Sequence, residues 1–244
     1  QGLKRSRAGQ MPAGVAALFT VAGRKAAAAT TFDFGFALGP RINAAGRLAD
    51  MTLGIECLLT DDASRAAELA ATLDGINRER REIEGGMREQ AMLMAESLFD
   101  ESEEPPPAIS VFDPDFHEGV VGIVASRIKD KLHRPTFVFA ASSAPGKEHE
   151  LKGSGRSIPG FHLRDALDLV AKRHPGVLLR FGGHAMAAGC TIAEDQFETF
   201  EQALQQVAAE WLDAATLTQR LPTDGALPAG YRRLDVADAL QQAV

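Results

Sequence analysis

Apolar residues recur at every third or fourth position of residues 62–99, and this period predicts one long helix. Asp61 and Asp62 offer capping side chains at its start. Gly85 and Gly86 lie inside the segment and permit a bend or a break, because glycine costs about 1 kcal/mol relative to alanine in a helix. Much of the segment is polar, so we expect a connector that crosses solvent. Its apolar stripe consists of Leu69, Leu73, Ile76, Ile83, Met87, Met94 and Leu98.

An acidic, proline-rich segment at residues 100–107 follows and predicts an exposed linker between domains. Beyond it, short apolar runs typical of strands alternate with amphipathic segments typical of helices. We expect strands at residues 108–112, 136–140, 150–156 and 187–192, and helices at residues 118–132, 163–173 and 194–212. This alternation predicts an α/β domain with helices packed on a mixed sheet. The tail from Thr216 onward, where prolines separate short apolar runs, predicts the start of a β-rich unit too short to fold by itself.

The composition is that of a globular protein that can bury a core: 45% of the 244 residues are hydrophobic and 24% are charged. Cys57 and Cys190 are far apart, which argues against a disulfide framework or a zinc site and favours a reducing cytoplasm. No apolar run reaches the roughly 20 residues of a membrane span, so we expect no membrane partner. Because the chain begins at Gln1 and ends at Val244 inside what reads as a new unit, we expect both ends to be cuts in a longer protein.

The charge is unevenly distributed, although the formal net charge of −7 by itself argues weakly against a nucleic-acid ligand. Residues 1–48 carry seven Lys or Arg against one acid (+6) and residues 113–192 carry eleven against eight (+3). Residues 49–112 carry five against fifteen (−10), and residues 193–244 carry three against nine (−6). The two positive segments are rich in glycine, which favours an anionic ligand shared between them. The alternative is that the uneven charge only reflects solvated helices.

Two glycine-containing segments combine small residues with donors suited to phosphate. In the first, residues 38–47 (LGPRINAAGR), Gly39 and Pro40 predict a sharp turn, and Arg fits bidentate phosphate contact. Its candidate donors are Arg41, Asn43 and Arg47. In the second, residues 152–157 (KGSGRS), the glycines free the backbone so that its N–H groups could converge on an anion. Its candidates are Ser154, Gly155, Arg156 and Ser157. On spacing alone we favour a helix–loop junction with paired arginines for the first segment, and a surface turn explains the second equally well.

A third segment, residues 181–189 (FGGHAMAAG), places His184 directly after Gly182 and Gly183 and before a run of small residues. A lone histidine is usually structural, but this setting favours a ligand contact, either donation to a phosphate oxygen or assistance to a leaving group. In a fourth segment, residues 113–119 (DPDFHEG), Asp115 could cap a helix and His117 could face the same cleft. For the fourth segment we favour capping alone.

Together these motifs resemble those of the RecJ-type single-strand-specific 5′→3′ DNA exonucleases of the DHH phosphoesterase superfamily. The resemblance runs from about residue 2 to residue 212, and it rests on GPRINAAGR, LDGINRERREIE, HEGVVGIVASR, LKGSGRSIPG and GGHAMAAG. It implies the C-terminal part of a DHH domain at residues 1–60, a connector helix and linker at 61–104, a nucleic-acid-binding DHH-associated domain at 105–213, and the start of an OB-fold at 214–244. The fold class is thus α/β.

The resemblance also implies an activity. In that family two metals, Mn²⁺ or Mg²⁺, activate a water that cleaves single-stranded DNA from its 5′ end in repair and recombination. No Asp-His-His signature occurs here, so we expect no metal ligand and no cofactor in this chain, and little activity from it alone. Arg41, Asn43 and Arg47 would line one side of a cleft.

The other side of that cleft would be formed by the residues of the α/β domain. By the same resemblance, Ser154, Gly155, Arg156, Ser157, Gly182 and Gly183 would hold phosphates, and His184 would be the catalytic residue nearest the scissile bond. A single-strand-binding protein is an implied partner beside the DNA. Two other functions remain open: a non-catalytic nucleic-acid-binding module, and a phosphodiesterase for short oligonucleotides or cyclic dinucleotides.

Overall fold

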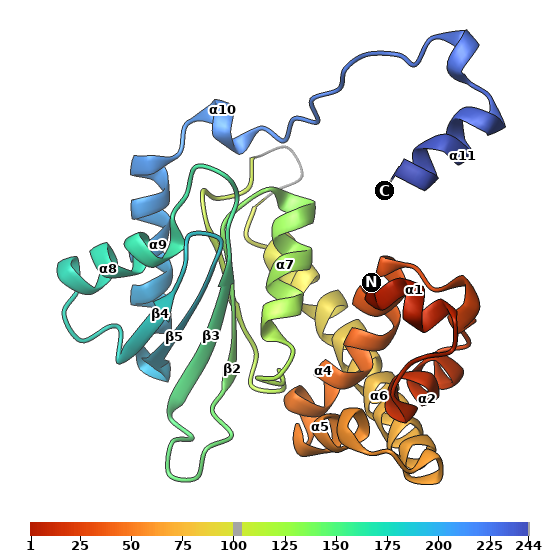
Figure 1. The fold of residues 1–244 in the computed structure, drawn as a ribbon. Coiled ribbons are helices and arrows are strands. Elements are labelled where there is room, and N and C mark those ends of the chain that lie inside the picture. The colour runs from red at the N-terminus through yellow and green to blue at the C-terminus, as the bar shows by residue number, and fades with distance from the viewer. Residues whose placement is uncertain (100–103, 244) are drawn as a thin grey trace.

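The computed structural model describes residues 1–99 and 104–243 and shows two units joined by one long helix (Figure 1). The first, which we call the helical unit, packs on the first half of α6 (Ala63–Glu96). It consists of α1 (Gly2–Arg7), α2 (Ala13–Val21), η1 (Ala26–Ala28), α3 (Thr31–Asp33), η2 (Phe34–Leu38), α4 (Gly39–Leu48) and α5 (Thr52–Leu59). Its core joins Leu18, Phe19 and Leu38 to Leu69 and Leu73 of α6.

Helix α6 confirms the expected long connector. Asp62 caps it, because its side chain accepts hydrogen bonds from the backbone N–H groups of Ser64 (2.8 Å) and Arg65 (3.2 Å). The helix continues without interruption through Gly85 and Gly86. Met87, Ala91 and Ala95 bury its second half against the next domain, and this packing offsets the cost of the two glycines. The predicted linker lies partly outside the described residues, since 100–103 are not among them.

A five-stranded mixed sheet forms the second unit, the α/β unit, which confirms the predicted fold class. The strands are β1 (Ile109–Phe112), β2 (Thr136–Ala141), β3 (Glu150–Arg156), β4 (Arg180–Gly183) and β5 (Ala187–Ala193), in the order β1-β2-β3-β5-β4. Only the β1–β2 pair is parallel. Helix α7 (Val121–Leu132) packs on one face, and α8 (Leu163–Arg173) and α9 (Phe197–Trp211) pack on the other (Figure 1).

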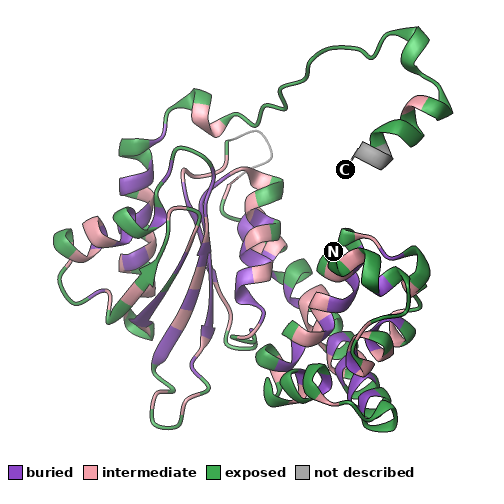
Figure 2. Cartoon of the chain, viewed as in Figure 1, coloured by how far each residue is buried: buried purple, intermediate pink, exposed green. Residues whose placement is uncertain are grey.

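Strand β4 was not predicted, because two of its four residues are glycines and the segment reads as a loop. The tail also differs from expectation. Between residues 214 and 243 the chain forms α10 (Ala214–Leu217), η4 (Ala229–Tyr231) and α11 (Leu234–Ala243), and no strand. The expected β-rich start is therefore wrong over these residues. In α11, Leu234, Ala237 and Leu240 recur at helical spacing, and the tail is exposed along nearly its whole length (Figure 2).

Candidate nucleic-acid interface

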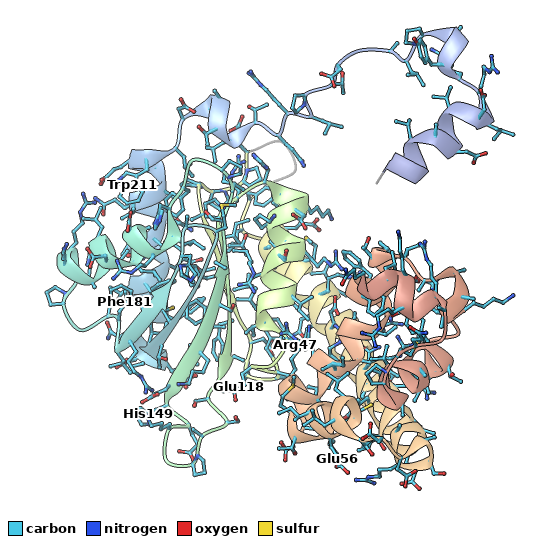
Figure 3. All side chains as sticks on the ribbon, viewed as in Figure 1. Arg47, Glu56, Glu118, His149, Phe181 and Trp211 are labelled. Carbon is cyan, nitrogen blue, oxygen red and sulfur yellow. The ribbon has the colours of Figure 1, made fainter. Side chains whose placement is uncertain are left out.

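Arg47 lies where the helical unit meets the α/β unit (Figure 3). Its Nη1 donates a 2.9 Å hydrogen bond to the carbonyl oxygen of Gly119, in the loop before α7. A Cβ at Gly119 would overlap the Arg47 carbonyl, so only glycine permits this approach. The predicted sharp turn at Gly39 and Pro40 is wrong: both begin α4, because proline is tolerated in the first helical turn.

Arg41 lies on the same helix, six residues before Arg47, but it serves a different purpose. It is 8% exposed. Its Nε and Nη2 donate to Asp74 of α6 at 2.9 and 2.8 Å, and its Nη1 donates to the Ala37 carbonyl at 2.6 Å. These bonds tie α4 to α6 and leave the guanidinium facing protein rather than a ligand, which matches the alternative of paired arginines.

Ser154 and Arg156 lie on one face of β3, because side chains alternate along a strand. Nη1 of Arg156 donates to Oγ of Ser154 at 3.1 Å and to the Gly155 carbonyl at 2.8 Å. The first turn of α7 lies against both, since a Cβ at Gly122 would stand 2.7 Å from Nη2 of Arg156 and 2.8 Å from Oγ of Ser154. A helix N-terminus attracts anions, so these groups offer three kinds of phosphate donor in one place.

The electrostatics of this place favour an anion. Burial lowers the pKa of Arg156, and the nearby positive charge of Arg47 lowers that pKa further. The two guanidinium groups carry like charges and repel each other across the boundary between the units. A bound phosphate would relieve this repulsion. We call Arg47, Ser154, Arg156 and the first turn of α7 the cationic cleft.

A cavity of about 200 Å³ opens beside Arg47, lined by Pro40, Asn43, Arg47, Arg80 and Ile123. Asn43 and Arg47, two candidates from the sequence, both line it. Arg80 was missed. Asn77 accepts 3.3 Å hydrogen bonds from Nε and Nη2 of Arg80, and Glu84 pairs with its Nη1 at 2.5 Å. The i,i+4 spacing of Arg80 and Glu84 is typical of a solvated helix face, so the sequence holds no signal that marks Arg80.

Two residues of the KGSGRS segment do not reach the cationic cleft. Ser157 is 2% exposed, and its hydroxyl donates to the Phe161 carbonyl at 2.6 Å. Gly155 pairs with Phe137 across the ladder, and a Cβ there would overlap the Phe137 ring. The glycine is therefore needed because an aromatic ring covers it, and its N–H belongs to a strand instead of converging on an anion.

The GGH segment forms the end of β4 and the turn into β5. Gly182 pairs with Gly189, which in turn pairs with Ser154. Gly183 has φ 138°, and a Cβ there would overlap the backbone of β5, so the position requires glycine. The turn is held in place by backbone donors, as Ser157 N–H bonds to the Met186 carbonyl at 3.0 Å. His184 is exposed in this turn, beyond the end of β3.

The fourth candidate segment shows local capping but not at α7. Asp113 accepts a hydrogen bond from the N–H of Asp115 at 2.9 Å, within the loop. His117 accepts one from the N–H of Gly119 at 3.0 Å through Nδ1. Asp115 does not cap α7, whose N-cap residue is Val120. The segment therefore shapes the loop that contacts Arg47.

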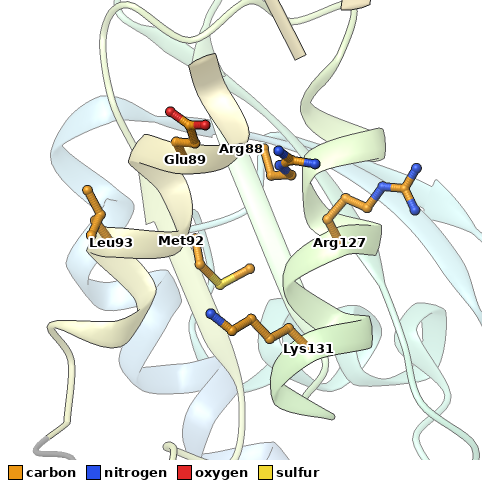
Figure 4. Close-up of a pocket in the computed structure, with 6 residues that line it drawn as sticks. All are labelled: Arg88, Glu89, Met92, Leu93, Arg127 and Lys131. Carbon is orange, nitrogen blue, oxygen red and sulfur yellow. The ribbon is translucent and has the colours of Figure 1, made fainter. Parts of the chain in front are cut away.

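A larger cavity, about 560 Å³, lies elsewhere, between α6 and α7 (Figure 4). Its lining residues are Arg88, Glu89, Met92, Leu93, Arg127 and Lys131, none of which the sequence singled out. Within residues 1–99 and 104–243, no group of three or more His, Cys, Asp or Glu side chains could hold a metal ion. No helix in the same part of the chain is long and apolar enough to cross a membrane.

Comparison with known proteins adds a family to this geometry. The DHHA1 domain family matches residues 105–210. The whole chain aligns with proteins named single-stranded-DNA-specific exonuclease RecJ, at 48% identity in Dickeya dadantii and 45% in Escherichia coli. These alignments cover 42% and 41% of the two relatives, so the chain spans about two fifths of their length.

Solved structures agree with the sequence relatives. A crystal structure of RecJ from Thermus thermophilus in complex with Mg²⁺ superposes with a TM-score of 0.73 at 32% identity, covering 87% of this chain and 30% of that one. An exonuclease RecJ bound to manganese gives a TM-score of 0.70 at 33% identity, covering 87% of this chain and 49% of that one.

Proposed function

The chain belongs to the RecJ family of single-stranded-DNA-specific exonucleases, and on that premise we propose that it holds the phosphodiester backbone of single-stranded DNA for such an enzyme. The convergence of Arg47, Ser154 and Arg156 at the first turn of α7 carries this proposal. The three donors come from both units. A strand bound among them would therefore lie between the units.

The chemistry of the cationic cleft suits a backbone rather than bases. Guanidinium groups, a hydroxyl and a helix N-terminus all recognise phosphate oxygens, so binding would be independent of sequence and sensitive to salt. His184, in the turn beyond the end of β3, would donate to the phosphate at the reacting bond. In this proposal the boundary between the units admits one strand and excludes a duplex, and that steric limit would give single-strand preference.

Cleavage belongs to the longer protein in this proposal. We propose 5′→3′ exonucleolysis in DNA repair and recombination, with two divalent metals activating the attacking water. The related structures hold Mg²⁺ or Mn²⁺, but the described residues of this chain do not offer a carboxylate and histidine set for such ions. We therefore assign the metals to other parts of the longer protein.

The experiment is fluorescence anisotropy of a 5′-phosphorylated single-stranded oligonucleotide with this chain across a salt series. Arg156→Ala should weaken binding about tenfold, because a hydrogen bond to a charged group contributes roughly 1.5–3 kcal/mol. It should also reduce the slope of log affinity against log salt by about 0.7, the value for one phosphate contact on a single strand. The chain alone should not cleave the oligonucleotide in manganese.

Arg164→Ala is the matched control. Arg164 lies on α8, on the opposite face of the sheet, and half of its side chain is exposed. The control removes the same charge but should leave the affinity unchanged. Equal losses from the two substitutions would show a general charge effect and overturn the proposed cleft. Equal binding of duplex and single strand would overturn the steric argument.

A further inference from the structure

We propose that Lys152 and Arg180 form a second phosphate subsite, to which the DNA strand continues from the cationic cleft across the open part of the sheet. The inference rests on the proposed function, because the same strand would occupy both places. It concerns residues that the sequence motifs did not mark as ligands. Its occupant is a phosphate of the nucleic-acid backbone.

Strand register places the second subsite in line with the first. Lys152, Ser154 and Arg156 alternate onto the same face of β3. Lys152 pairs with Thr191, and Thr191 pairs with Arg180, so the two cations share one row across three strands. Ser154, Gly189 and Gly182 form the neighbouring row. The two rows therefore lie side by side on the face that carries Arg156.

The surface between the subsites is hollow because it lacks side chains. Gly182 and Gly189 are both exposed, and no atom lies within 4 Å of a Cβ position at Gly182. A cavity of about 360 Å³ opens next to them, lined by Lys152, Gly153, Arg180, Phe181, Gly189, Cys190 and Thr191. A sugar or a base could lie on this floor while its phosphates reach the cations at either end.

Glu150 holds the two cations in place and neutralises only part of their charge. Its carboxylate is 11% exposed and lies 3.7 Å from Nζ of Lys152 and 3.3 Å from Nη2 of Arg180. Lys147 is a third cation, with Nζ 3.3 Å from Oε1. Three positive charges around one carboxylate leave a local excess, which a backbone phosphate could balance. Thr191 adds a hydroxyl 3.4 Å from Nζ of Lys152.

The distance between the subsites sets the ligand length. Arg156 and Lys152 are four residues apart on one strand, which corresponds to about 13 Å of backbone. Their flexible side chains span a range around that value, and a strand would need about two nucleotides to bridge it. A 5′-phosphorylated dinucleotide has two phosphates that are only one nucleotide apart, so it could fill the cationic cleft and yet fail to reach Lys152.

Length dependence is therefore the test. The double substitution Lys152→Ala and Arg180→Ala should weaken binding of an oligonucleotide of about ten residues roughly tenfold and reduce its salt slope by about 1.4, the value for two contacts. Binding of a 5′-phosphorylated dinucleotide should stay unchanged. Loss of affinity for both ligands, or for neither, would overturn the second subsite. The double substitution Arg164→Ala and Lys172→Ala on α8, on the opposite face, controls for the loss of two charges.

Glu150→Gln gives a result of opposite sign and does not depend on a stable double variant. Removing the carboxylate frees the two cations, so the longer oligonucleotide should bind more tightly and the dinucleotide equally well. Equal tightening of both would show a non-specific charge effect and contradict the proposal. A free mononucleotide that competes at Lys152 but not at Arg156 would identify the subsite as a site for single nucleotides instead and would overturn strand continuity.

The two proposals fail in distinguishable ways. If Arg156→Ala leaves the affinity for the longer oligonucleotide and for the dinucleotide unchanged, the cationic cleft is overturned. A normal Arg156→Ala effect, together with a Lys152 and Arg180 variant that behaves as wild type at every length, would overturn only the second subsite.

Discussion

Gly122 at the start of α7 lies against the guanidinium group of Arg156, with a Cβ position 2.7 Å from Nη2. The same Cβ would stand 2.8 Å from Oγ of Ser154. Gly122→Ala should therefore displace the ends of both side chains and weaken single-strand binding by roughly tenfold, the loss expected for one charged hydrogen bond. Stability should not fall, because alanine in a helix is favoured over glycine by about 1 kcal/mol. Anisotropy and urea unfolding measure the two effects separately.

Gly85→Ala is the control for this substitution. Gly85 lies inside α6 with no atom within 4 Å of its Cβ position. The change should raise stability by about 1 kcal/mol and leave DNA binding unchanged. A Gly122→Ala variant that binds DNA like wild type would show that α7 does not position Arg156.

Gly155 is expected to matter for folding and not for phosphate contact, because Phe137 covers it. Gly155→Ala should destabilise the chain by about 1–3 kcal/mol, the cost of overpacking a core. When Gly155→Ala is combined with Phe137→Ala, the two losses of unfolding free energy should be less than additive, because alanine at position 137 makes room for the new methyl group at position 155. A urea double-mutant cycle measures the coupling. Strict additivity, or loss of DNA binding at full stability, would contradict the packing role.

The regular elements could be predicted because their apolar periods are long and local. The observed bounds of three elements match the predicted bounds closely: α6, β3 (Glu150–Arg156) and α8 (Leu163–Arg173). Strand β4 could not be predicted, since its ladder with β5 depends on contacts that no local pattern reveals. The helix α11 was misread because prolines before it suggested a β-rich unit.

The candidate site could be predicted only in part, because it too depends on contacts between residues far apart in the sequence. Residue type and glycine content marked Arg47, Ser154 and Arg156 as candidates. Arg41 has the same chemistry as Arg47, and only the position of Asp74, 33 residues away, shows that it is a structural anchor. Arg80 resembles any surface arginine of a polar helix until α4 and α7 are placed beside it.

Arg41 and Arg47 should respond oppositely to substitution. Arg41→Ala should destabilise the chain by about 3 kcal/mol, because it breaks a largely buried pair with Asp74. Arg47→Ala should change stability by less than about 0.5 kcal/mol, since Arg47 is exposed. It should instead lower the salt slope of DNA binding by about 0.7. Urea unfolding and a salt titration decide the case, and an unstable Arg47→Ala with an unaltered slope would reverse the two assignments.

Cys190 should make stability depend on alkaline pH, because burial raises the pKa of its thiol. In the unfolded chain a thiol loses its proton near about pH 8.5. Above that value the unfolded state releases a proton that the native state keeps, so the free energy of unfolding should fall with rising pH, by at most about 1.4 kcal/mol per unit. Cys190→Ala should lower stability at neutral pH and show a shallower decline above about pH 8.5. Urea unfolding of both proteins between about pH 7 and 10 measures the difference, with Cys57 present in each as an internal constant. Parallel curves would show that the Cys190 thiol ionises as easily in the native state as in the unfolded one.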